Sequence, residues 1–170
     1  MYDLCVIGGG WAGFNAALKG KKVGLKTCLI EQSLIGGTCL NYGCIPTKTI
    51  IQSIKFYSLA KKSSIFGINI NSPQIDLPGI QKRKEEIVNR LGQGMRFMLK
   101  GIDIVESEAK IISPNKISVD SGNIETKFII LATGSKPIEL PSFRFNSKNI
   151  LSSKEILNLK RIPDSILIIG

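Results

Sequence analysis

The sequence predicts an α/β fold with a mainly parallel sheet, an inserted pair of helices and a small antiparallel β excursion. Short apolar runs at residues 3–7, 26–31 and 128–132 are typical of buried parallel strands. Apolar residues recur at helical intervals over residues 46–61 and 80–98, which lie between those runs. The 170 residues are enough for one domain with a sizeable core.

The first 31 residues have the length of a strand–helix–strand unit. The apolar run of residues 3–7 is interrupted by three glycines, Gly8 to Gly10. A helical pattern continues from Ala12 to about Lys19, and a second strand is expected at residues 26–31. About 30 residues is the usual size of a βαβ crossover, so these strands should pair in parallel.

The middle of the chain predicts a helical excursion over about residues 46–100. The first helix should run from Pro46 to about Lys61, and a loop with glycine, asparagine and proline follows over residues 67–78. The second helix carries an amphipathic stripe. The apolar positions of the two helices are Ile50, Ile54, Tyr57 and Leu59 in the first, and Ile80, Ile87, Leu91, Met95 and Met98 in the second.

The second half of the chain predicts strands and one short helix. Strands are expected at residues 102–106, 110–113 and 116–119, another after Gly122, and a buried one at 128–132, with a β excursion at about 109–126. A short helix should follow near residues 153–159 and a strand at 165–169.

The chain ends with a pattern that resembles its beginning. Leu167 to Gly170 and Leu4 to Gly8 are both apolar runs that lead into glycine. We therefore expect a first domain over residues 1–150, and a linker with the first strand of a truncated second domain over residues 151–170. This division predicts that the chain is a fragment.

Composition excludes several classes of protein. The net charge of +10 comes mostly from scattered lysines without interleaved aromatic residues, and no nucleic-acid motif accompanies them. A lysine-rich surface is the simpler interpretation; an anionic partner or cofactor phosphates are the alternative. No apolar run approaches the roughly 20 residues that span a bilayer, and no signal or transit sequence opens the chain. We expect a cytoplasmic protein that binds neither nucleic acid nor membrane.

Gly8, Gly10 and Gly13 form a G-x-G-x-x-G motif between a strand and a helix. Gly8 permits the tight turn, Gly10 lets the backbone approach a pyrophosphate, and Gly13 allows close packing of helix and strand. Glu31 follows about 20 residues later at the end of the next strand, where it can accept hydrogen bonds from ribose hydroxyls. Such a unit is typical of a Rossmann-like dinucleotide site; otherwise, Glu31 is a surface acid.

The four cysteines divide into two kinds. Cys5 and Cys28 lie in apolar strands, where buried inert thiols are expected. Cys39 and Cys44 lie in a glycine-rich turn before a helix, and a helix N-terminus with a nearby cation such as Lys48 favours a reactive thiol. The alternatives for this pair are two free thiols or half of a metal site. A zinc site is disfavoured because the two cysteines have no further cysteine or histidine nearby, and we expect no metal.

A disulfide between Cys39 and Cys44 requires an irregular backbone. Residues five apart in an ideal helix have Cα atoms about 8.6 Å apart, whereas a disulfide needs less than about 7 Å. Gly43 offers the required freedom. A bridge held in distorted backbone should be easier to reduce than a structural one.

The thirteen residues from Gly36 to Lys48 resemble the redox-active signature of the class I pyridine nucleotide–disulfide oxidoreductases. The resemblance extends to Gly8–Gly13, Glu31 and Ala132–Ser135, and so covers nearly the whole chain. Leu40 and Ile45, with Thr47 before Lys48, are most similar to the dihydrolipoamide dehydrogenases of this family. Glutathione and mercuric reductases more often have valine at the first two positions.

The resemblance implies an FAD-binding domain and a thiol–disulfide reaction. Cys39 would be the interchange thiol and Cys44 the thiol beside the flavin. The cofactor-binding residues would be Gly8, Gly10, Gly13, Glu31 and Gln32 for the ADP half, Ala109 at the adenine, Gly37, Thr38 and Lys48 on the flavin side, and Thr133, Gly134 and Ser135 at the return to the domain.

The resemblance also implies components that this chain does not carry. NAD would bind in the full-length parent, and a His–Glu pair of the partner subunit would serve the substrate thiols. The expected partners are a lipoyl domain of a 2-oxo acid dehydrogenase or glycine cleavage complex and a second subunit in a homodimer. The fragment alone should be inactive. The alternatives are another flavin disulfide reductase, of mercuric or glutathione reductase type, and a stand-alone, non-catalytic FAD-binding module.

Overall fold

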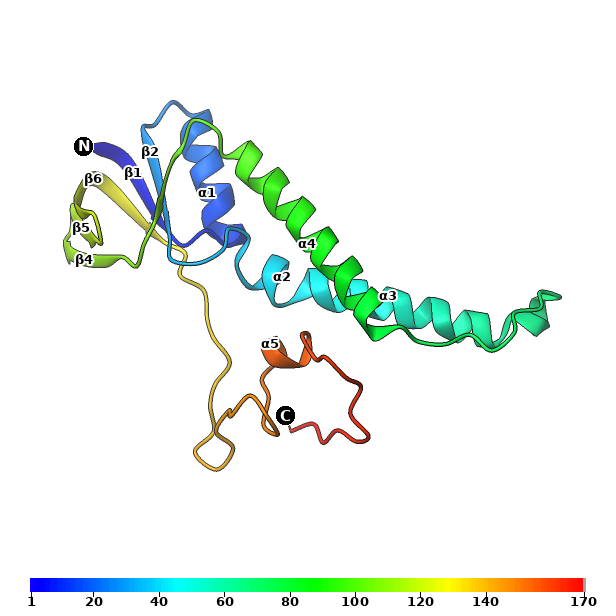
Figure 1. The fold of residues 1–170 in the computed structure, drawn as a ribbon. Coiled ribbons are helices and arrows are strands. Elements are labelled where there is room, and N and C mark those ends of the chain that lie inside the picture. Colours follow the sequence, from blue (N-terminus) through cyan, green and yellow to red (C-terminus); the bar gives the residue numbers. More distant parts are fainter. Residues whose placement is uncertain (170) are drawn as a thin grey trace.

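The computed structural model describes residues 1–169 and has a six-stranded sheet at its centre (Figure 1). The strand order is β3 (Asp103–Glu106), β2 (Thr27–Glu31), β1 (Tyr2–Ile7), β6 (Gly122–Leu131), β5 (Lys116–Val119) and β4 (Lys110–Ser113). β1 lies parallel to β2 and β6, and β2 lies parallel to β3. The predicted α/β fold with its mainly parallel sheet is therefore confirmed.

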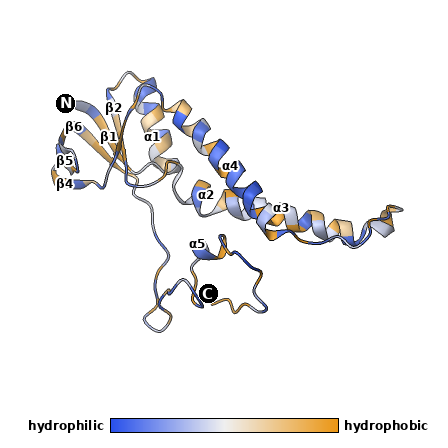
Figure 2. Ribbon diagram, viewed as in Figure 1, coloured by the Kyte–Doolittle hydropathy of each residue, from blue (hydrophilic) through white to orange (hydrophobic). Residues whose placement is uncertain are grey.

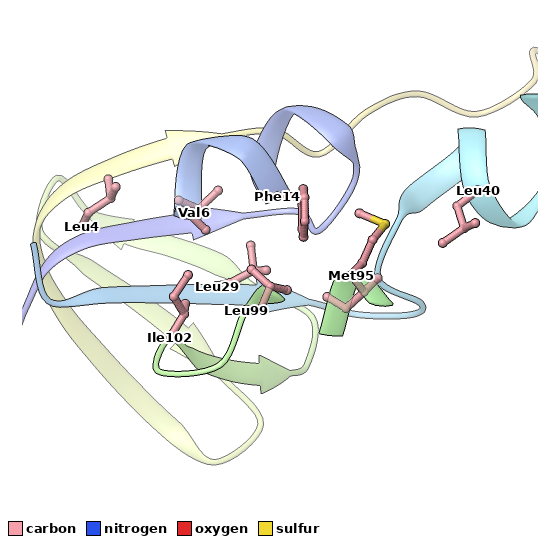
Figure 3. Packing of buried hydrophobic residues seen from close by; sticks show 10 residues of the cluster. Leu4, Val6, Phe14, Leu29, Leu40, Met95, Leu99 and Ile102 are labelled. Atoms are coloured by element: carbon pink, nitrogen blue, oxygen red, sulfur yellow. The ribbon is translucent and has the colours of Figure 1, made fainter. Parts of the chain in front are cut away.

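Helices cover one face of this sheet. α1 (Trp11–Lys22) lies against β1 and β2, and the end of α4 (Leu77–Met98) packs beside it. Alternate residues of the strands point to this face because successive side chains of a strand point to opposite sides. The core between sheet and helices contains Leu4, Val6 and Leu29 from the strands, and Phe14, Leu40, Met95, Leu99 and Ile102 from the covering segments (Figure 3).

The β excursion covers the other face. Cys5, Ile7, Cys28 and Ile30 pack there against residues that include Ile117 and Val119 of β5. The sequence predicted two strands between Gly122 and Ala132, and this was wrong because β6 is one strand of ten residues. Its first part pairs antiparallel with β5 and its second part parallel with β1, so it connects the excursion to the central sheet.

The inserted helical pair projects away from the sheet (Figure 1). α3 (Cys44–Lys61) is followed by a 3-10 turn (Ser63–Phe66), and α4 then runs back alongside α3. The helices form as predicted, but their apolar positions are not all buried. Met95 is buried, whereas Ile54, Leu59, Leu91 and Met98 are exposed. Figure 2 shows α4 as largely hydrophilic, consistent with packing along a narrow strip.

The C-terminal part is mostly irregular. α5 spans Ser153–Ile156 and not 153–159. In the residues that follow it, the Leu157 carbonyl and the Asn158 side chain accept hydrogen bonds from Lys84 of α4. The strand predicted at 165–169 is absent among the described residues, where Leu167 and Ile168 are 86% and 84% exposed without a neighbouring strand. Gly170, the end of the predicted strand–glycine repeat, lies outside the described residues. In residues 1–169, no helix has both the length and the apolar character needed to cross a membrane.

Candidate active site

The turn from β1 into α1, residues 8–13, is called the glycine turn. Gly8 has a φ of 105°, and a Cβ there would lie 2.2 Å from the Ala132 carbonyl oxygen. A Cβ on Gly13 would lie 1.8 Å from the Gly8 carbonyl oxygen. Both positions therefore require glycine for the chain's own packing, which agrees with the predicted roles of these two residues.

Gly10 differs from its neighbours in the motif. The nearest atom to a Cβ at this position would be the Gly37 Cα, at 3.8 Å, which is an ordinary contact. The chain itself would accept a side chain here. A glycine leaves free space at the N-terminus of α1, where backbone N–H groups and the helix dipole attract anions.

Glu31 is the last residue of β2, and its side chain contacts the backbone of the glycine turn. One carboxylate oxygen accepts a hydrogen bond from the Gly9 N–H at 2.6 Å, and the other accepts one from the Ser33 N–H at 2.8 Å. Each carboxylate oxygen has two lone pairs, so both can accept a further bond from a ligand hydroxyl. Glu31 is partly buried, and its carboxylate is held by these two backbone N–H groups.

A cavity of about 190 Å³ lies between the ends of β1, β2 and β3. Five of the predicted cofactor-binding residues line it, namely Gly8, Glu31, Gln32, Ala109 and Thr133. The remaining lining residues are Ile7, Ile30, Ser107 and Glu108. The exposed residues Gly134 and Ser135 are not part of this lining.

Sequence reasoning missed Ser107 and Glu108. Ser107 is buried, donates its hydroxyl to the Glu108 carbonyl at 2.8 Å and accepts the Asp120 N–H at 3.0 Å. Its own N–H donates to the Glu31 carbonyl at 3.2 Å. The available signal was their position just after β3, because the carboxyl ends of parallel strands meet at one edge of the sheet, where ligands bind.

The residues from Cys39 to Cys44, called the cysteine loop, join two helices. Cys39 lies inside α2 (Gly37–Asn41), where the sequence predicted only a turn, and Cys44 is the first residue of α3. The helices are separated at Tyr42 and Gly43, which confirms the predicted irregular backbone. A Cβ on Gly43 would be 3.0 Å from the Thr38 carbonyl oxygen, so glycine allows this tight connection.

Cys39 and Cys44 are free thiols. The neighbouring Cys44 side chain and partial burial raise the pKa of Cys39 above its ordinary value. The Trp11 side chain and the Cys44 backbone N–H act in the opposite direction and lower the pKa of Cys39. Cys44 is exposed, and Lys48, also exposed, lies one turn further along α3 on the same side.

Backbone contacts join the cysteine loop to the glycine turn. The Gly36 N–H donates to the Gly9 carbonyl at 2.8 Å, and Gly10 and Gly36 form a parallel bridge. A Cβ on Gly37 would lie 2.8 Å from the Gly10 Cα. The N-termini of α1, α2 and α3 thus belong to one continuous site.

The other two cysteines have no access to this site. Cys5 and Cys28 are register partners on β1 and β2, and both are fully buried. The interaction with Cys5, together with burial, raises the pKa of Cys28. Across residues 1–169, no cluster of three or more histidine, cysteine, aspartate or glutamate side chains could hold a metal ion.

The residues present fit a dinucleotide that extends from the cavity to the cysteine loop. Glu31 and Gln32 stand at the cavity, Gly10 leaves room for phosphates at the start of α1, and Gly37 and Thr38 continue toward the thiols. A flavin dinucleotide has this sequence of chemical groups, with its adenosine and its redox ring at opposite ends.

Comparison with known proteins shows what this arrangement is similar to. The model of the pyridine nucleotide-disulphide oxidoreductase family matches residues 2–170. The chain belongs to this family. Within the family, it is 35% identical to a dihydrolipoyl dehydrogenase of Bacillus subtilis over 184 residues and 40% identical to dihydrolipoyl dehydrogenase 1, mitochondrial, of Arabidopsis thaliana over 177 residues.

Two solved structures have a similar fold. The HOCl-induced flavoprotein disulfide reductase RclA from Escherichia coli has a TM-score of 0.78 and 28% identity, over 95% of this chain and 35% of that chain. LpdA from Mycobacterium tuberculosis, with a TM-score of 0.81 and 24% identity over 95% of this chain and 38% of that chain, shares the fold.

The chain is shorter than these relatives. The alignments include 99% of its residues but 39% of the B. subtilis protein and 35% of the A. thaliana protein. The alignments therefore cover only the part of each relative that corresponds to the glycine turn, the cysteine loop and the sheet.

Proposed function

We propose that this chain supplies the FAD-binding domain and the redox-active thiols of a dihydrolipoamide dehydrogenase. The observation that carries the proposal is the backbone contact between the glycine turn and the cysteine loop, which brings the two thiols beside the dinucleotide-binding turn. The dihydrolipoyl dehydrogenases among the relatives support the substrate class.

We assign the site residues to parts of FAD in the order in which they lie between the cavity and the cysteine loop. Gly8, Gly10, Gly13 and Glu31 would hold the ADP half of FAD, with Gln32 and Ala109 at the adenine end. Gly37, Thr38 and Lys48 would line the flavin side. Thr133, Gly134 and Ser135 would contact FAD where β6 returns toward the glycine turn. When bound, FAD would accept two electrons from the reduced cysteine pair.

The thiol chemistry belongs to the chain itself. A thiolate of dihydrolipoamide attacks the Cys39 sulfur of a Cys39–Cys44 disulfide, which forms a mixed disulfide and releases Cys44 as a thiolate. The second substrate thiol loses its proton and attacks the first substrate sulfur, which releases Cys39 and cyclic lipoamide. The substrate dithiol is oxidised by two electrons and the cysteine pair is reduced by two. Cys44 is the first residue of α3, and Lys48 follows one turn later in the same helix.

The proposal includes the rest of the protein to which the chain would belong. Residues 1–150 would form the FAD-binding domain, and residues 151–170 would lead into an NAD-binding domain. The parent would be a cytoplasmic homodimer that transfers electrons from the lipoyl domain of a 2-oxo acid dehydrogenase or glycine cleavage complex to NAD+.

The similarity to RclA favours one alternative, another flavin disulfide reductase with a different thiol substrate. A comparison of dihydrolipoamide and glutathione turnover, on a protein that carries this chain and has the full length of its relatives, would decide between the two. Turnover of dihydrolipoamide with NAD+ supports the proposal. Turnover of glutathione alone would overturn the substrate class.

Site-resolved alkylation tests the cofactor on this chain. We expect FAD to slow the reaction of iodoacetamide with Cys44 in a saturable way, because the flavin end would cover this exposed thiol. ADP should occupy the cradle without covering Cys44, and should restore its reactivity in competition with FAD. Unchanged reactivity of Cys44 at FAD concentrations that saturate binding would contradict the proposed flavin position.

A further inference from the structure

Most of the positive charge of this chain lies on the inserted helical pair. Residues 44–100 contain ten lysine and arginine residues and three acidic ones, so this third of the chain carries +7 of the net charge of +10. From residue 32 to residue 75 there is no aspartate or glutamate. Because the pair projects away from the sheet (Figure 1), cofactor phosphates at the start of α1 do not explain the charge of its distal part.

Three lysines on α3 form a row that begins beside Cys44. Lys48, Lys55 and Lys62 are seven residues apart, and Cys44 precedes the first of them by four. Because a helix has 3.6 residues per turn, intervals of four and seven keep side chains on one side of it. These three residues, called the lysine row, therefore start one turn from the exposed thiol, and the line from Cys44 to Lys62 is about 27 Å long.

The lysine row lies on the side of α3 that faces away from α4. The buried residues of α3, Pro46, Thr49 and Ala60, lie roughly half a turn around the helix from the row. The Thr49 carbonyl accepts a hydrogen bond from Arg83 of α4 at 3.1 Å, which identifies this opposite side as the one that packs on α4. All three lysines of the row are exposed, and none forms an ion pair with any of residues 1–169.

Apolar side chains accompany the lysine row. Ile51 and Ile54 are 46% and 39% exposed, and Leu59 is 58% exposed. They line a groove with a volume of about 490 Å³, and Lys55 and Lys62 belong to the same lining. An exposed apolar patch bordered by charges of one sign is typical of a surface that binds a protein partner.

The charge selects the kind of partner. A second copy in a symmetric contact on this face would place the lysine row against an identical row, with no acidic residue from 32 to 75 to neutralise it. An acidic protein surface would instead meet opposite charge, and its apolar side chains could enter the groove. Because the row begins one turn from Cys44, a protein bound there would lie beside the two thiols.

We propose that the lysine row and its groove are the docking surface for an acidic face of the protein domain that carries the substrate dithiol. The inference rests on the proposed function, in which a protein-bound dithiol reaches Cys39 and Cys44. Docking raises the local concentration of the dithiol beside these thiols and adds no chemical step. Attraction between opposite charges also speeds encounter, and salt weakens this effect.

The test compares two dihydrolipoyl peptides as reductants of the Cys39–Cys44 disulfide, which is first formed with excess lipoamide that is then removed. Each peptide has dihydrolipoyl-lysine at one end and about ten residues, enough to span the row in extended form. One contains four glutamates, and the other contains glutamines in their places. The rate of reduction is measured by counting thiols with a mass-tagging reagent.

The glutamate peptide should react about tenfold faster than the glutamine peptide at an ionic strength of about 0.01 M, where charges are weakly screened. The two rates should converge at about 1 M, where the screening length is about 3 Å. Equal rates at low ionic strength would overturn the proposal.

Lys55→Gln/Lys62→Gln tests the surface itself and leaves Lys48, which is assigned to the flavin side, unchanged. At low ionic strength, the advantage of the glutamate peptide should fall from about tenfold to about twofold, because two ion pairs are lost. The rate with the glutamine peptide should not change. Lys19→Gln/Lys22→Gln, which removes the same charge from exposed positions of α1, is the matched control and should keep the advantage. An equal decrease in both double variants would assign the effect to net charge and contradict a docking surface.

Free dihydrolipoamide separates this inference from the proposed function. Its failure to reduce the disulfide would contradict the proposed function, whereas reduction by dihydrolipoamide with equal rates for the two peptides would overturn the docking surface alone. Sedimentation with vesicles of anionic phospholipid tests the other source of negative charge. Binding of the wild type that Lys55→Gln/Lys62→Gln abolishes, together with equal peptide rates, would assign the row to a membrane and overturn the proposal.

Discussion

At the scale of single residues, the glycines of the glycine turn differ in how closely other atoms of the chain approach them. Gly8 and Gly13 are required by the chain's own atoms, since a Cβ would overlap the Ala132 and Gly8 carbonyl oxygens respectively. Gly10 meets no such obstacle. In the proposed function, glycine at this position leaves space for a ligand, so the two kinds of glycine can be separated by experiment.

Gly13→Ala should destabilise the fold, and Gly10→Ala should weaken ligand binding. Overlap with the Gly8 carbonyl should cost about 3 kcal/mol of unfolding free energy in Gly13→Ala. Gly10→Ala should keep nearly the wild-type stability but bind FAD at least about tenfold more weakly, because its methyl group enters the phosphate space. Denaturant unfolding and FAD titration measure the two effects.

Gly94→Ala is the control for these substitutions. Gly94 is exposed in α4, and the Cβ of an alanine there would have no neighbouring atom within 4 Å, so alanine should stabilise the helix by about 0.5–1 kcal/mol. FAD affinity should not change. Equal losses of stability in Gly10→Ala and Gly13→Ala would contradict the distinction.

At the scale of elements, α4 anchors the C-terminal segment beside the cysteine loop. Lys84 is buried, and its Nζ donates to the Leu157 carbonyl at 2.9 Å and to the Asn158 Oδ1 at 2.7 Å. The Gln81 Nε2 donates to the Leu159 carbonyl at 3.0 Å. The anchored segment brings the Lys154 Nζ to 4.3 Å from the centre of the Tyr42 ring, in the cysteine loop.

Lys84→Met should release this segment. Methionine fills a similar volume but leaves the Leu157 carbonyl and the Asn158 Oδ1 without their charged donor, which should cost about 1–3 kcal/mol of docking free energy. We expect faster tryptic cleavage at Lys154, Lys160 and Arg161 and faster hydrogen exchange over residues 152–160. Lys82→Met, on an exposed position of the same helix, is the control. Protection that is unchanged in Lys84→Met would show that other contacts hold the segment.

The start of β1 is tied to neighbouring strands by a carboxylate. The two oxygens of Asp3 accept bonds from the Lys127 Nζ at 2.7 Å and the Lys26 N–H at 2.9 Å. The bond from Lys127 is the main cause that lowers the pKa of Asp3 below its ordinary value of 3.8, and the Lys26 N–H adds to it. The ionised form is therefore favoured in the folded state.

Asp3→Asn should lower stability in a manner that depends on pH. The contribution of Asp3 is fully present well above pH 3.8 and is lost as the pH falls through the lowered folded pKa. Wild type should therefore unfold at a higher temperature than Asp3→Asn at pH 6, and the difference should vanish by about pH 2. A difference of constant size between pH 6 and pH 2 would exclude titration of Asp3 as its cause.

The elements also show where sequence reasoning reached its limit. Strands β1 to β5 and helices α1, α3 and α4 could be predicted from the sequence, because each has a regular spacing of apolar residues within a short stretch of chain. The short helix α2 was missed because Gly36 and Gly37, typical of a turn, begin it. The sequence predicted two strands where the structure has β6. The pairing partner of β6 changes from β5 to β1 along its length, and this change depends on tertiary structure that no local pattern shows.

At the scale of the whole molecule, the two halves of the candidate site were predictable separately but their contact was not. The glycine motif and the cysteine signature indicate a dinucleotide and a redox pair from their own residues. The bridge between Gly10 and Gly36, the burial of Ser107 and the position of Trp11 depend on how β1, β2 and β3 align their carboxyl ends. No local pattern carries that information.

The whole molecule also explains why two of four cysteines are available for chemistry. Cys5 and Cys28 are sealed between the sheet and the β excursion, whereas Cys39 and Cys44 open to solvent at the edge where the helices begin. The central claim is that this second pair is a reversible two-electron centre.

Equilibration of the chain with mixtures of dihydrolipoamide and lipoamide tests that claim most directly. Thiols are counted by a mass-tagging reagent, and the disulfide is located by peptide mapping. We predict that two thiols per chain exchange reversibly, that they are Cys39 and Cys44, and that Cys39→Ser or Cys44→Ser abolishes the intramolecular disulfide while Cys5 and Cys28 stay reduced. A Cys39–Cys44 pair that remains a dithiol across the whole range of mixtures, or a disulfide that maps to Cys5 and Cys28, would contradict the account.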